Sequence, residues 1–316
     1  MDPLLFVHIP KTAGTSFRKG AEECFGSHRT LKDYGEESEQ TSREIQQWVY
    51  GNYDPYILKT VVRRDNVKFM TGYYKIDRYK SIFSIEHTVS FLRNPLDRIL
   101  SAYNHNVNYN GFNKGIEDFI MIPDHQDKQS KFLAGVPLES IGFLGISECY
   151  SDSLSLINQK FNVNIQNLQL NKGNYSGVSH ITENLKDQIL SVNSNDTILY
   201  ERVRQMLSLR LEMHSQNLPY VRGLVTEYKN ARCFGWACFD SSDEPVGLEI
   251  YKKNKRIGYV SAVDWRPYLA AFGIRRSGHV GFSFHVGELT PDDLLEVRVQ
   301  STGQVLESAP GFLARV

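Results

Sequence analysis

The sequence predicts an α/β fold of three layers built on a parallel sheet, followed by a C-terminal all-β sandwich. Apolar strand-like runs and helical stretches alternate in the first part of the chain, which is typical of a mostly parallel sheet. After about residue 217 the pattern changes to short strand-like runs separated by Gly, Pro, Asp and Ser, which indicates antiparallel strands. We therefore expect a first domain over residues 1–220 and a small β-sandwich over residues 225–316.

The elements follow from the spacing of apolar residues and from turn signals. In the first domain we expect strands over 4–9, 67–74 and 88–92, and helices over 17–24, 43–50, 95–105, 116–120, 126–133, 151–161 and 196–214. The strand over 4–9 is expected at the centre of the sheet. The polar stretch 31–41 and the asparagine-rich stretch 106–114 predict loops, the second of them mobile and close to the site. In the second domain we expect strands over 230–238, 246–251, 256–261, 280–286 and 294–299.

The segment of residues 4–16 predicts an anion-binding site. Its apolar strand ends at Pro10, and a short loop of small and hydroxylated residues leads into a helix. Loop amides and the helix dipole favour an anion there, Lys11 adds a full charge, and hydroxyls come from Thr12, Thr15 and Ser16. In a Walker A loop the lysine follows the glycines. Lys11 precedes Gly14, so the loop is P-loop-like but fits an ordinary ATP or GTP site poorly.

A second strand-to-helix segment, residues 87–103, predicts a second anion site. Asn94 can cap the helix, and Pro95 suits its first position. Arg93 ends the strand, where open α/β sheets bind ligands, while Arg98 and Ser101 are three apart and share a helix face. Arg93 with Ser101 can hold a phosphate. Solvated arginines on a capped helix would explain this segment alone, but two such segments together favour a ligand with two anionic groups.

Composition limits the classes of function. The chain has 316 residues with 41% hydrophobic and 23% charged residues, as expected of a globular protein with two domains. Lysine plus arginine equals aspartate plus glutamate, 36 each, so no global basic field favours nucleic acid or an anionic membrane. No apolar run approaches the length of a membrane span. The cysteines fit neither a disulfide framework nor a zinc site, and we expect reduced thiols at Cys24, Cys149, Cys233 and Cys238.

The two anion segments carry a resemblance to a known family. Ile-Pro-Lys-Thr-Ala-Gly-Thr-Ser at 9–16 resembles the 5′-phosphosulfate loop of the carbohydrate sulfotransferases. Phe-Leu-Arg-Asn-Pro-Leu-Asp-Arg-Ile-Leu-Ser-Ala-Tyr at 91–103 resembles their 3′-phosphate motif. Weaker similarity to bacterial members occurs at 33–35, 129–133, 142–148 and 196–201. The chain is thus similar to a bacterial-type member of the heparan 2-O-sulfotransferase-like superfamily.

The resemblance implies 3′-phosphoadenosine 5′-phosphosulfate (PAPS) as co-substrate, without a metal. It assigns PAPS binding to Lys11, Thr12, Ala13, Gly14, Thr15, Ser16, Arg93 and Ser101. Sulfuryl transfer passes through a transition state with spread charge, so positioning and electrostatics dominate. Lys11 would stabilise the charge that grows on the leaving phosphate. Golgi relatives carry a membrane anchor, and no signal peptide or anchor is seen here, so we expect a cytoplasmic protein.

The general base is the open question in this resemblance. Relatives place a base histidine after glycine at the end of the third strand, and Tyr73 follows Gly72 here. A phenol with a pKa of about 10 is a poor base at neutral pH. Asp33 and His105 are the other candidates, and we rank Asp33 first, His105 second and Tyr73 third. His8, within the first strand, is expected to be a structural hydrogen bonder.

Three functions are compatible with the sequence. The leading one is transfer of a sulfuryl group from PAPS to a hydroxyl of a carbohydrate. The second is a small-molecule kinase with an atypical phosphate loop, and the third is a glycan-binding protein with an inactive nucleotide domain. In the C-terminal domain, Trp236, Trp265 and Tyr268 are candidates to stack on sugars, and this domain is a candidate carbohydrate-binding module.

Overall fold

In the computed structural model, residues 2–168, 181–290, 293–309 and 312 are described. The chain forms two compact units. The first unit comprises Met1–Phe83, His87–Val136 and Ile141–Ser208. The second unit comprises Leu209–Val316 together with two short segments, Ser84–Glu86 and Pro137–Ser140, which precede it in the sequence.

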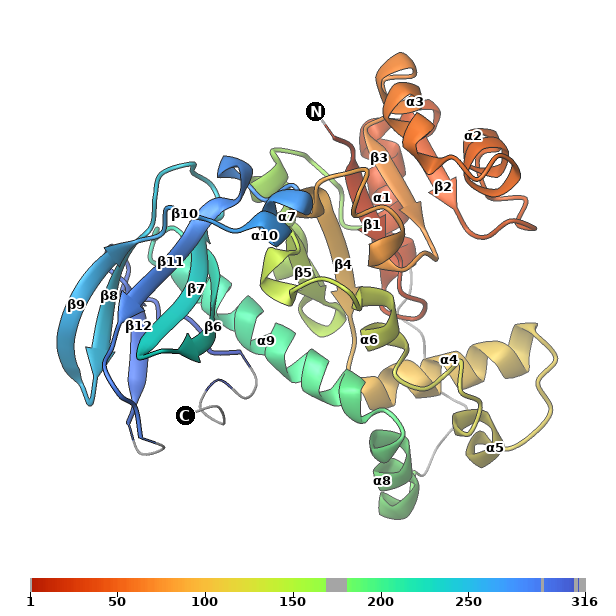
Figure 1. Ribbon diagram of the computed structural model, residues 1–316. Helices are drawn as coiled ribbons and strands as arrows, with labels where there is room; N and C mark the ends of the chain where they lie inside the picture. Colours follow the sequence, from red (N-terminus) through yellow and green to blue (C-terminus); the bar gives the residue numbers. More distant parts are fainter. Residues whose placement is uncertain (1, 169–180, 291–292, 310–311, 313–316) are drawn as a thin grey trace. The chain divides into compact units, whose positions relative to one another are not determined.

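The first unit is built on a parallel sheet of five strands, coloured red to yellow-green in Figure 1. The strands are β1 (Leu4–Val7), β2 (Thr30–Asp33), β3 (Phe69–Gly72), β4 (Thr88–Leu92) and β5 (Phe143–Ile146). Their order is β2-β3-β1-β4-β5, and every pairing is parallel. β1 lies at the centre of the sheet, which confirms the predicted α/β fold.

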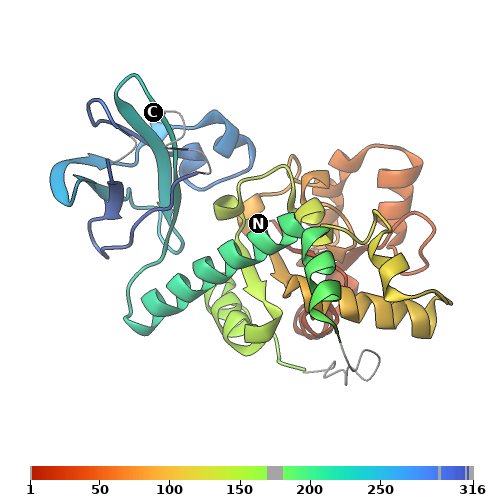
Figure 2. The same cartoon turned by 90° about the horizontal axis from the view of Figure 1, so that it is seen from below.

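Helices flank this sheet. They are α1 (Gly14–Phe25), α2 (Arg43–Ile45), α3 (Leu58–Arg64), α4 (Pro95–Tyr109), α5 (Ile116–Ile120), α6 (Lys128–Leu133), α7 (Tyr150–Phe161), α8 (Glu183–Ser191) and α9 (Ser194–Ser215). Figures 1 and 2 both show α5 and α8 beside α4. Isoleucine and leucine side chains of these three helices form one buried cluster, at Ile99, Ile116, Ile120, Leu185 and Ile189.

Aromatic rings hold the helices on one face of the sheet. Phe17 of α1 packs with its ring centroid 4.7 Å from Phe6 of β1 and 5.4 Å from Phe91 of β4. Phe91 in turn lies 5.2 Å from the Tyr150 ring of α7. α1 and α7 therefore cover the same face, and burial of rings of this size contributes strongly to stability. Because both faces are covered, β1 and β4 are buried along their whole length, although β4 includes Thr88 and Ser90.

Two expected loops of the first unit are partly regular structure, and one of its strands lies where no element was expected. The 31–41 stretch begins with β2, whose Lys32 and Asp33 look unlike a strand but pair with β3 at the sheet edge. The 143–146 stretch is strand β5. α4 continues into the expected loop as far as Tyr109. The Asn106 amide donates to the Ala102 carbonyl at 2.9 Å, so an asparagine expected to end the helix bonds to its preceding turn.

The second unit is an antiparallel sandwich. Its strands are β6 (Val221–Lys229), β7 (Arg232–Phe239), β8 (Gly247–Lys252), β9 (Lys255–Ser261), β10 (Asp264–Trp265), β11 (His279–His285) and β12 (Leu295–Val299). They form sheets β10-β11-β7-β6 and β12-β8-β9. One core contains residues of both sheets, among them Val225, Cys233, Leu248, Ile250 and Val297. This confirms the all-β prediction. β6 was not expected as a strand.

Two large side chains of the second unit, Trp236 and Arg222, are buried. Trp236 is completely buried, so it cannot stack on a sugar, whereas Trp265 and Tyr268 are exposed. Arg222 is buried too, and its guanidinium pairs with the Glu86 carboxylate and with Asp240 Oδ1, the latter at 3.0 Å.

Candidate active site

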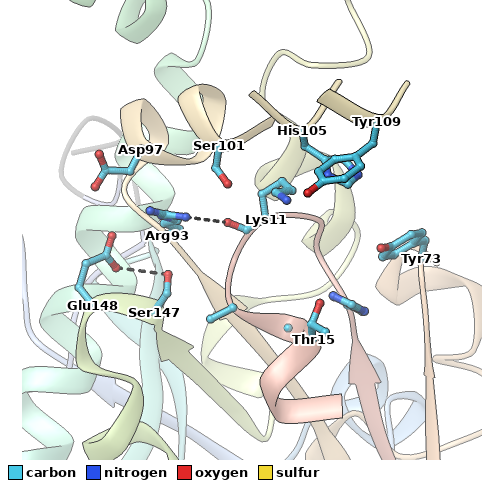
Figure 3. A pocket seen from close by; sticks show the side chains of 13 residues that line it. Lys11, Thr15, Tyr73, Arg93, Asp97, Ser101, His105, Tyr109, Ser147 and Glu148 are labelled. Atoms are coloured by element: carbon cyan, nitrogen blue, oxygen red, sulfur yellow. Dashed lines mark hydrogen bonds between the residues drawn. The ribbon is translucent and has the colours of Figure 1, made fainter. Parts of the chain in front are cut away.

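A cavity of about 670 Å³ opens in the first unit, a volume within the usual range of ligand sites. It is lined by His8, Lys11, Ala13, Gly14, Thr15, Tyr73, Arg93, Asp97, Ser101, His105, Tyr109, Ser147 and Glu148 (Figure 3). These residues follow the carboxyl ends of β1, β3, β4 and β5. The cavity therefore lies at the sheet edge where open α/β folds bind ligands.

The loop between β1 and α1 has an unusual backbone. Lys11 and Ala13 have φ angles of 71° and 65°, in the left-handed region that side-chain-bearing residues rarely adopt. Between them, the buried Thr12 hydroxyl donates to the Ile9 carbonyl at 2.9 Å and fixes the turn. Ala13 precedes α1 and has no side-chain oxygen to cap it, and the Ser16 amide donates to the Ala13 carbonyl at 3.2 Å, so the amides before Ser16 are the ones that suit an anion. Strain of this kind concentrates at functional sites.

Gly14 is needed for space. A Cβ on Gly14 would lie 2.2 Å from Cδ2 of His8, so any side chain would displace the imidazole below the loop. The His8 Nδ1 lies 3.2 Å from the Tyr34 hydroxyl. Burial, together with the charges of Arg18 and Lys11, lowers the pKa of His8 to about 3, so its ring is neutral at physiological pH. His8 is therefore a neutral hydrogen bonder under the anion loop, although it also lines the cavity.

Lys11 and Arg93 give the cavity its positive charge. The Arg93 guanidinium donates to the Lys11 carbonyl at 3.5 Å and joins the ends of β1 and β4 (Figure 3). Burial and the nearby charge of Arg93 lower the pKa of Lys11. Two cations held in one cavity repel each other, and an anion between them would remove that repulsion.

α4 places Ser101 and His105 over the same cavity. The Asn94 Oδ1 caps this helix by accepting from the Leu96 and Asp97 amides at 3.0 and 3.4 Å, which confirms the predicted cap. Figure 3 shows the Ser101 side chain directed from α4 toward the space beside Lys11.

Arg98 does not share this exposure. It is buried, and its guanidinium donates to the His125 carbonyl at 2.6 Å and lies 3.8 Å from Asp196 Oδ2. Arg98 and Ser101 were expected to share a helix face, but the Arg98 side chain is buried and Ser101 lines the cavity.

Most of the predicted residues gather in this cavity. Those that line it are Lys11, Ala13, Gly14, Thr15, Tyr73, Arg93, Ser101 and His105. Thr12 and Ser16 are buried beside the loop and do not line it. The Thr12 hydroxyl already donates within the turn, so only its backbone amide is available to a ligand.

Asp33, the first-ranked base, lies outside the cavity. Its side chain is 2% exposed. The Tyr50 and Tyr79 hydroxyls donate to its two oxygens at 2.7 and 2.6 Å, and Arg78 Nε lies 3.2 Å from Oδ2. A carboxylate held this way is a structural hydrogen-bond acceptor. A substrate hydroxyl in the cavity has no route to it. The ranking of Asp33 first is therefore not supported.

The two other base candidates face the cavity and differ in protonation. Burial and the charge of Lys11 lower the pKa of His105 below its ordinary value of 6.5, so its imidazole is neutral near pH 7. Burial raises the pKa of Tyr73, so its phenol keeps its proton. His105 can accept a proton at neutral pH, while the protonated Tyr73 can only form hydrogen bonds or present its ring.

Four lining residues were missed by sequence reasoning: Asp97, Tyr109, Ser147 and Glu148. Ser147 and Glu148 follow β5, which was not expected to be a strand. The Ser147 hydroxyl donates to the Leu92 carbonyl at 2.9 Å, and Glu148 Oε1 accepts from the Asn94 amide at 2.8 Å. The apolar run before Ser147 was the signal that could have found them.

Comparison with known proteins identifies the family. The sequence model of the sulfotransferase family matches residues 1–164, just over half of the chain, so the chain belongs to the sulfotransferase family and is a transferase. Among solved structures it is similar to the crystal structure of a sulfotransferase from Alicyclobacillus acidocaldarius. The identity is 13%, the TM-score is 0.38, and the match covers 66% of this chain and 96% of that one. No curated protein sequence matches.

The described residues contain neither a helix suited to crossing a membrane nor a group of side chains suited to a metal ion. None of the helices in this part of the chain combines the length and the apolar character needed to cross a bilayer. Within the same residues, no three His, Cys, Asp or Glu side chains gather as they would around a metal ion.

Proposed function

We propose that this sulfotransferase moves a sulfuryl group from PAPS to a hydroxyl of a carbohydrate. The observation that carries the proposal is the pairing of Lys11 and Arg93 at the ends of adjacent strands, in one cavity with the anion loop. The cavity thus holds two cations in fixed positions, which suit two phosphate groups of a single ligand.

The donor is proposed to bind with its phosphates divided between the two sequence motifs. The 5′-phosphosulfate takes the amides at the start of α1, the Thr15 hydroxyl and the Lys11 ammonium, and the 3′-phosphate takes Arg93 and Ser101. Lys11 then lies next to the bridging oxygen, where negative charge grows as the S–O bond breaks. An interaction that strengthens only in the transition state raises turnover more than affinity.

The acceptor is proposed to enter beside Tyr73, Tyr109 and His105. His105 takes the proton of the attacking hydroxyl, because its lowered pKa leaves it neutral at physiological pH. Tyr73 and Tyr109 are 49% and 77% exposed, and rings of this kind suit the apolar faces of a sugar.

The kinase alternative gains one observation. Asp97 and Glu148 line the cavity, and a magnesium ion is commonly held by one or two carboxylates together with substrate phosphates. Glu148, however, already accepts from the Asn94 amide. In Figure 3, Arg93 lies between these carboxylates and Lys11, which favours a metal-free nucleotide.

Ligand binding separates the proposed functions. Calorimetric titration with adenosine 3′,5′-bisphosphate, AMP and ATP with magnesium should give tight binding for the bisphosphate alone. Transfer of radiolabelled sulfate from PAPS to a panel of glycans then tests catalysis. Preference for ATP with magnesium would favour the kinase, and glycan binding without transfer would favour the inactive module.

We also propose that the second unit binds glycan chains. Trp265 and Tyr268 are 57% and 41% exposed on β10 and α10 (Pro267–Ala271), so they are available to a glycan chain. Replacing both with alanine should weaken binding of long glycans and leave bisphosphate binding unchanged. Unchanged affinity for long glycans would remove this role.

A further inference from the structure

The backbone of Arg93 is held by a residue that does not line the cavity. The Arg93 amide donates to Gln129 Oε1 at 2.8 Å, and Gln129 Nε2 donates to the Arg93 carbonyl at 3.0 Å. Gln129 is fully buried and 36 residues away in the sequence. The side-chain amide of Gln129 thus satisfies both the N–H and the C=O of Arg93. Arg93 lies just past the end of β4, where strand pairing no longer satisfies these groups.

Gln129 is itself held by a buried carboxylate at the start of α9. Asp196 Oδ2 accepts from the backbone amide of Gln129 at 3.1 Å. Asp196 Oδ1 accepts from the backbone amide and the hydroxyl of Ser130 at 2.7 and 2.8 Å. Asp196 has no exposed surface. These contacts fix the first turn of α6, and with it the direction of the Gln129 side chain.

The same carboxylate also reaches α4. Arg98 Nε lies 3.8 Å from Asp196 Oδ2, and Arg98 is three residues before Ser101 on that helix. Asp196 is therefore connected to both halves of the proposed 3′-phosphate site, through Gln129 to Arg93 and through Arg98 to the helix that carries Ser101.

We propose that Gln129 and Asp196 are positioning residues that set the spacing of Arg93 and Ser101, and thereby the selectivity for a nucleotide with a 3′-phosphate. This proposal rests on the proposed function. Neither residue touches the ligand. Their effect comes from geometry, because a guanidinium binds a phosphate well only when its planar fork is aligned.

The second unit offers a matched control for this proposal. Gln304 is buried and makes the same two bonds to the backbone of Val221, at 2.9 and 2.6 Å. Gln129→Met and Gln304→Met each replace a buried amide clamp with an apolar side chain of similar length. The two variants lose the same kind of contact, but only the first one lies next to the proposed site.

The experiment measures the ratio of dissociation constants for AMP and adenosine 3′,5′-bisphosphate, with the melting temperature of each full-length variant. Gln129→Met should lower this ratio about tenfold, since a misplaced arginine loses charge-assisted bonds to the 3′-phosphate. Gln304→Met should lower the melting temperature and leave the ratio unchanged.

Each other result decides against the proposal. An unchanged ratio in Gln129→Met, or an equal fall in Gln304→Met, overturns it while leaving the proposed function in place. A wild-type protein that binds both nucleotides alike overturns both proposals. If Gln129→Met does not fold, Ser130→Ala replaces it, because it removes only the hydroxyl bond to Asp196. The ratio should then fall about threefold, and a wild-type ratio overturns the proposal.

Discussion

The two units each bury an arginine among carboxylates, and the two arrangements differ in what lies beside them. In the first unit, Arg98 and Asp196 stand behind Arg93 and Ser101, which line the cavity. In the second unit, Arg222 of β6 pairs with Glu86 and Asp240. Buried ion pairs are weak evidence for stability as such, because desolvation offsets much of their attraction. A buried pair of the same kind is thus proposed to position ligand-binding residues in the first unit and joins separate segments of the chain in the second.

The second-unit pair joins segments that are far apart in the sequence. Besides its two carboxylate partners, Arg222 donates to the Ser140 carbonyl at 3.1 Å. Glu86 and Ser140 belong to the two short segments that group with the C-terminal part of the chain. The pair thus holds segments of the second unit together, and none of its members lines the cavity.

The largest effect is expected from breaking this second-unit pair. Arg222→Leu removes a buried guanidinium from the largely covered Glu86 and Asp240 carboxylates, which keep Arg275 and Arg210 as partners at 3.5 and 3.3 Å. The loss should cost about 3 kcal/mol of unfolding free energy, the lower end for a broken buried pair. Chemical denaturation measures this loss. The ratio of AMP to bisphosphate dissociation constants should stay at the wild-type value, and a changed ratio would break the comparison between the two units.

The next effect concerns Lys11 on the ligand side of the first-unit network. Lys11→Ala should lower turnover about a hundredfold or more, because its charge is needed as the leaving phosphate forms. Binding of adenosine 3′,5′-bisphosphate should fall much less. Steady-state kinetics and calorimetry on one preparation measure both. Near-wild-type turnover would show that another group stabilises the leaving phosphate.

Arg93→Ala tests the residue that the first-unit network is proposed to hold. The thermal shift caused by adenosine 3′,5′-bisphosphate should largely disappear, since the lost charge-assisted bonds are worth about 1.5–3 kcal/mol. The smaller shift caused by AMP should persist. Equal losses for both nucleotides would mean that Arg93 acts on the fold or on the 5′-phosphate. The contact between Arg93 and Gln129 would then not explain selectivity for a 3′-phosphate.

The pH profile gives a smaller and independent effect. A base with a lowered pKa stays neutral to lower pH, so activity should hold down to pH 6.5 and fall as His105 becomes protonated below it. Because the charge of Lys11 contributes to this shift, Lys11→Met should raise the His105 pKa, as NMR titration of the imidazole can measure. An acid limb above pH 6.5, or full activity in His105→Gln, would remove His105 as the base.

The sequence predicts most strands of both units and misses some in each. Strand periodicity and turn residues identified β1, β3 and β4 of the parallel sheet and five strands of the sandwich, since these segments carry strong local signals. β2, β5, β6 and β10 were missed, because pairing with neighbouring strands decides their conformation. A cut after residue 225 would fall inside β6, so a sequence boundary placed there does not correspond to a loop.

The site divides in the same way. Lys11 and Arg93 were found because a charge at the end of an apolar strand is a local feature. Glu148 and the burial of Asp33 were not, because they depend on which segments meet in space. Gln129 and Asp196 lay in segments predicted to be helical and weakly similar to the family. Nothing in the linear pattern indicates that one side-chain amide spans both backbone groups of Arg93.

The smallest effect is expected at Ala13, in the strained loop of the first unit. Ala13 has a φ of 65°, a conformation that glycine adopts without the usual penalty of about 1–2 kcal/mol. Ala13→Gly relieves this strain but increases the freedom of the unfolded chain by about 0.4–1 kcal/mol. The two changes nearly cancel, so the melting temperature should stay close to wild type. Bisphosphate affinity should also be kept, because the amides that face the anion remain in place. A large loss of affinity would show that the Ala13 methyl contacts the ligand directly.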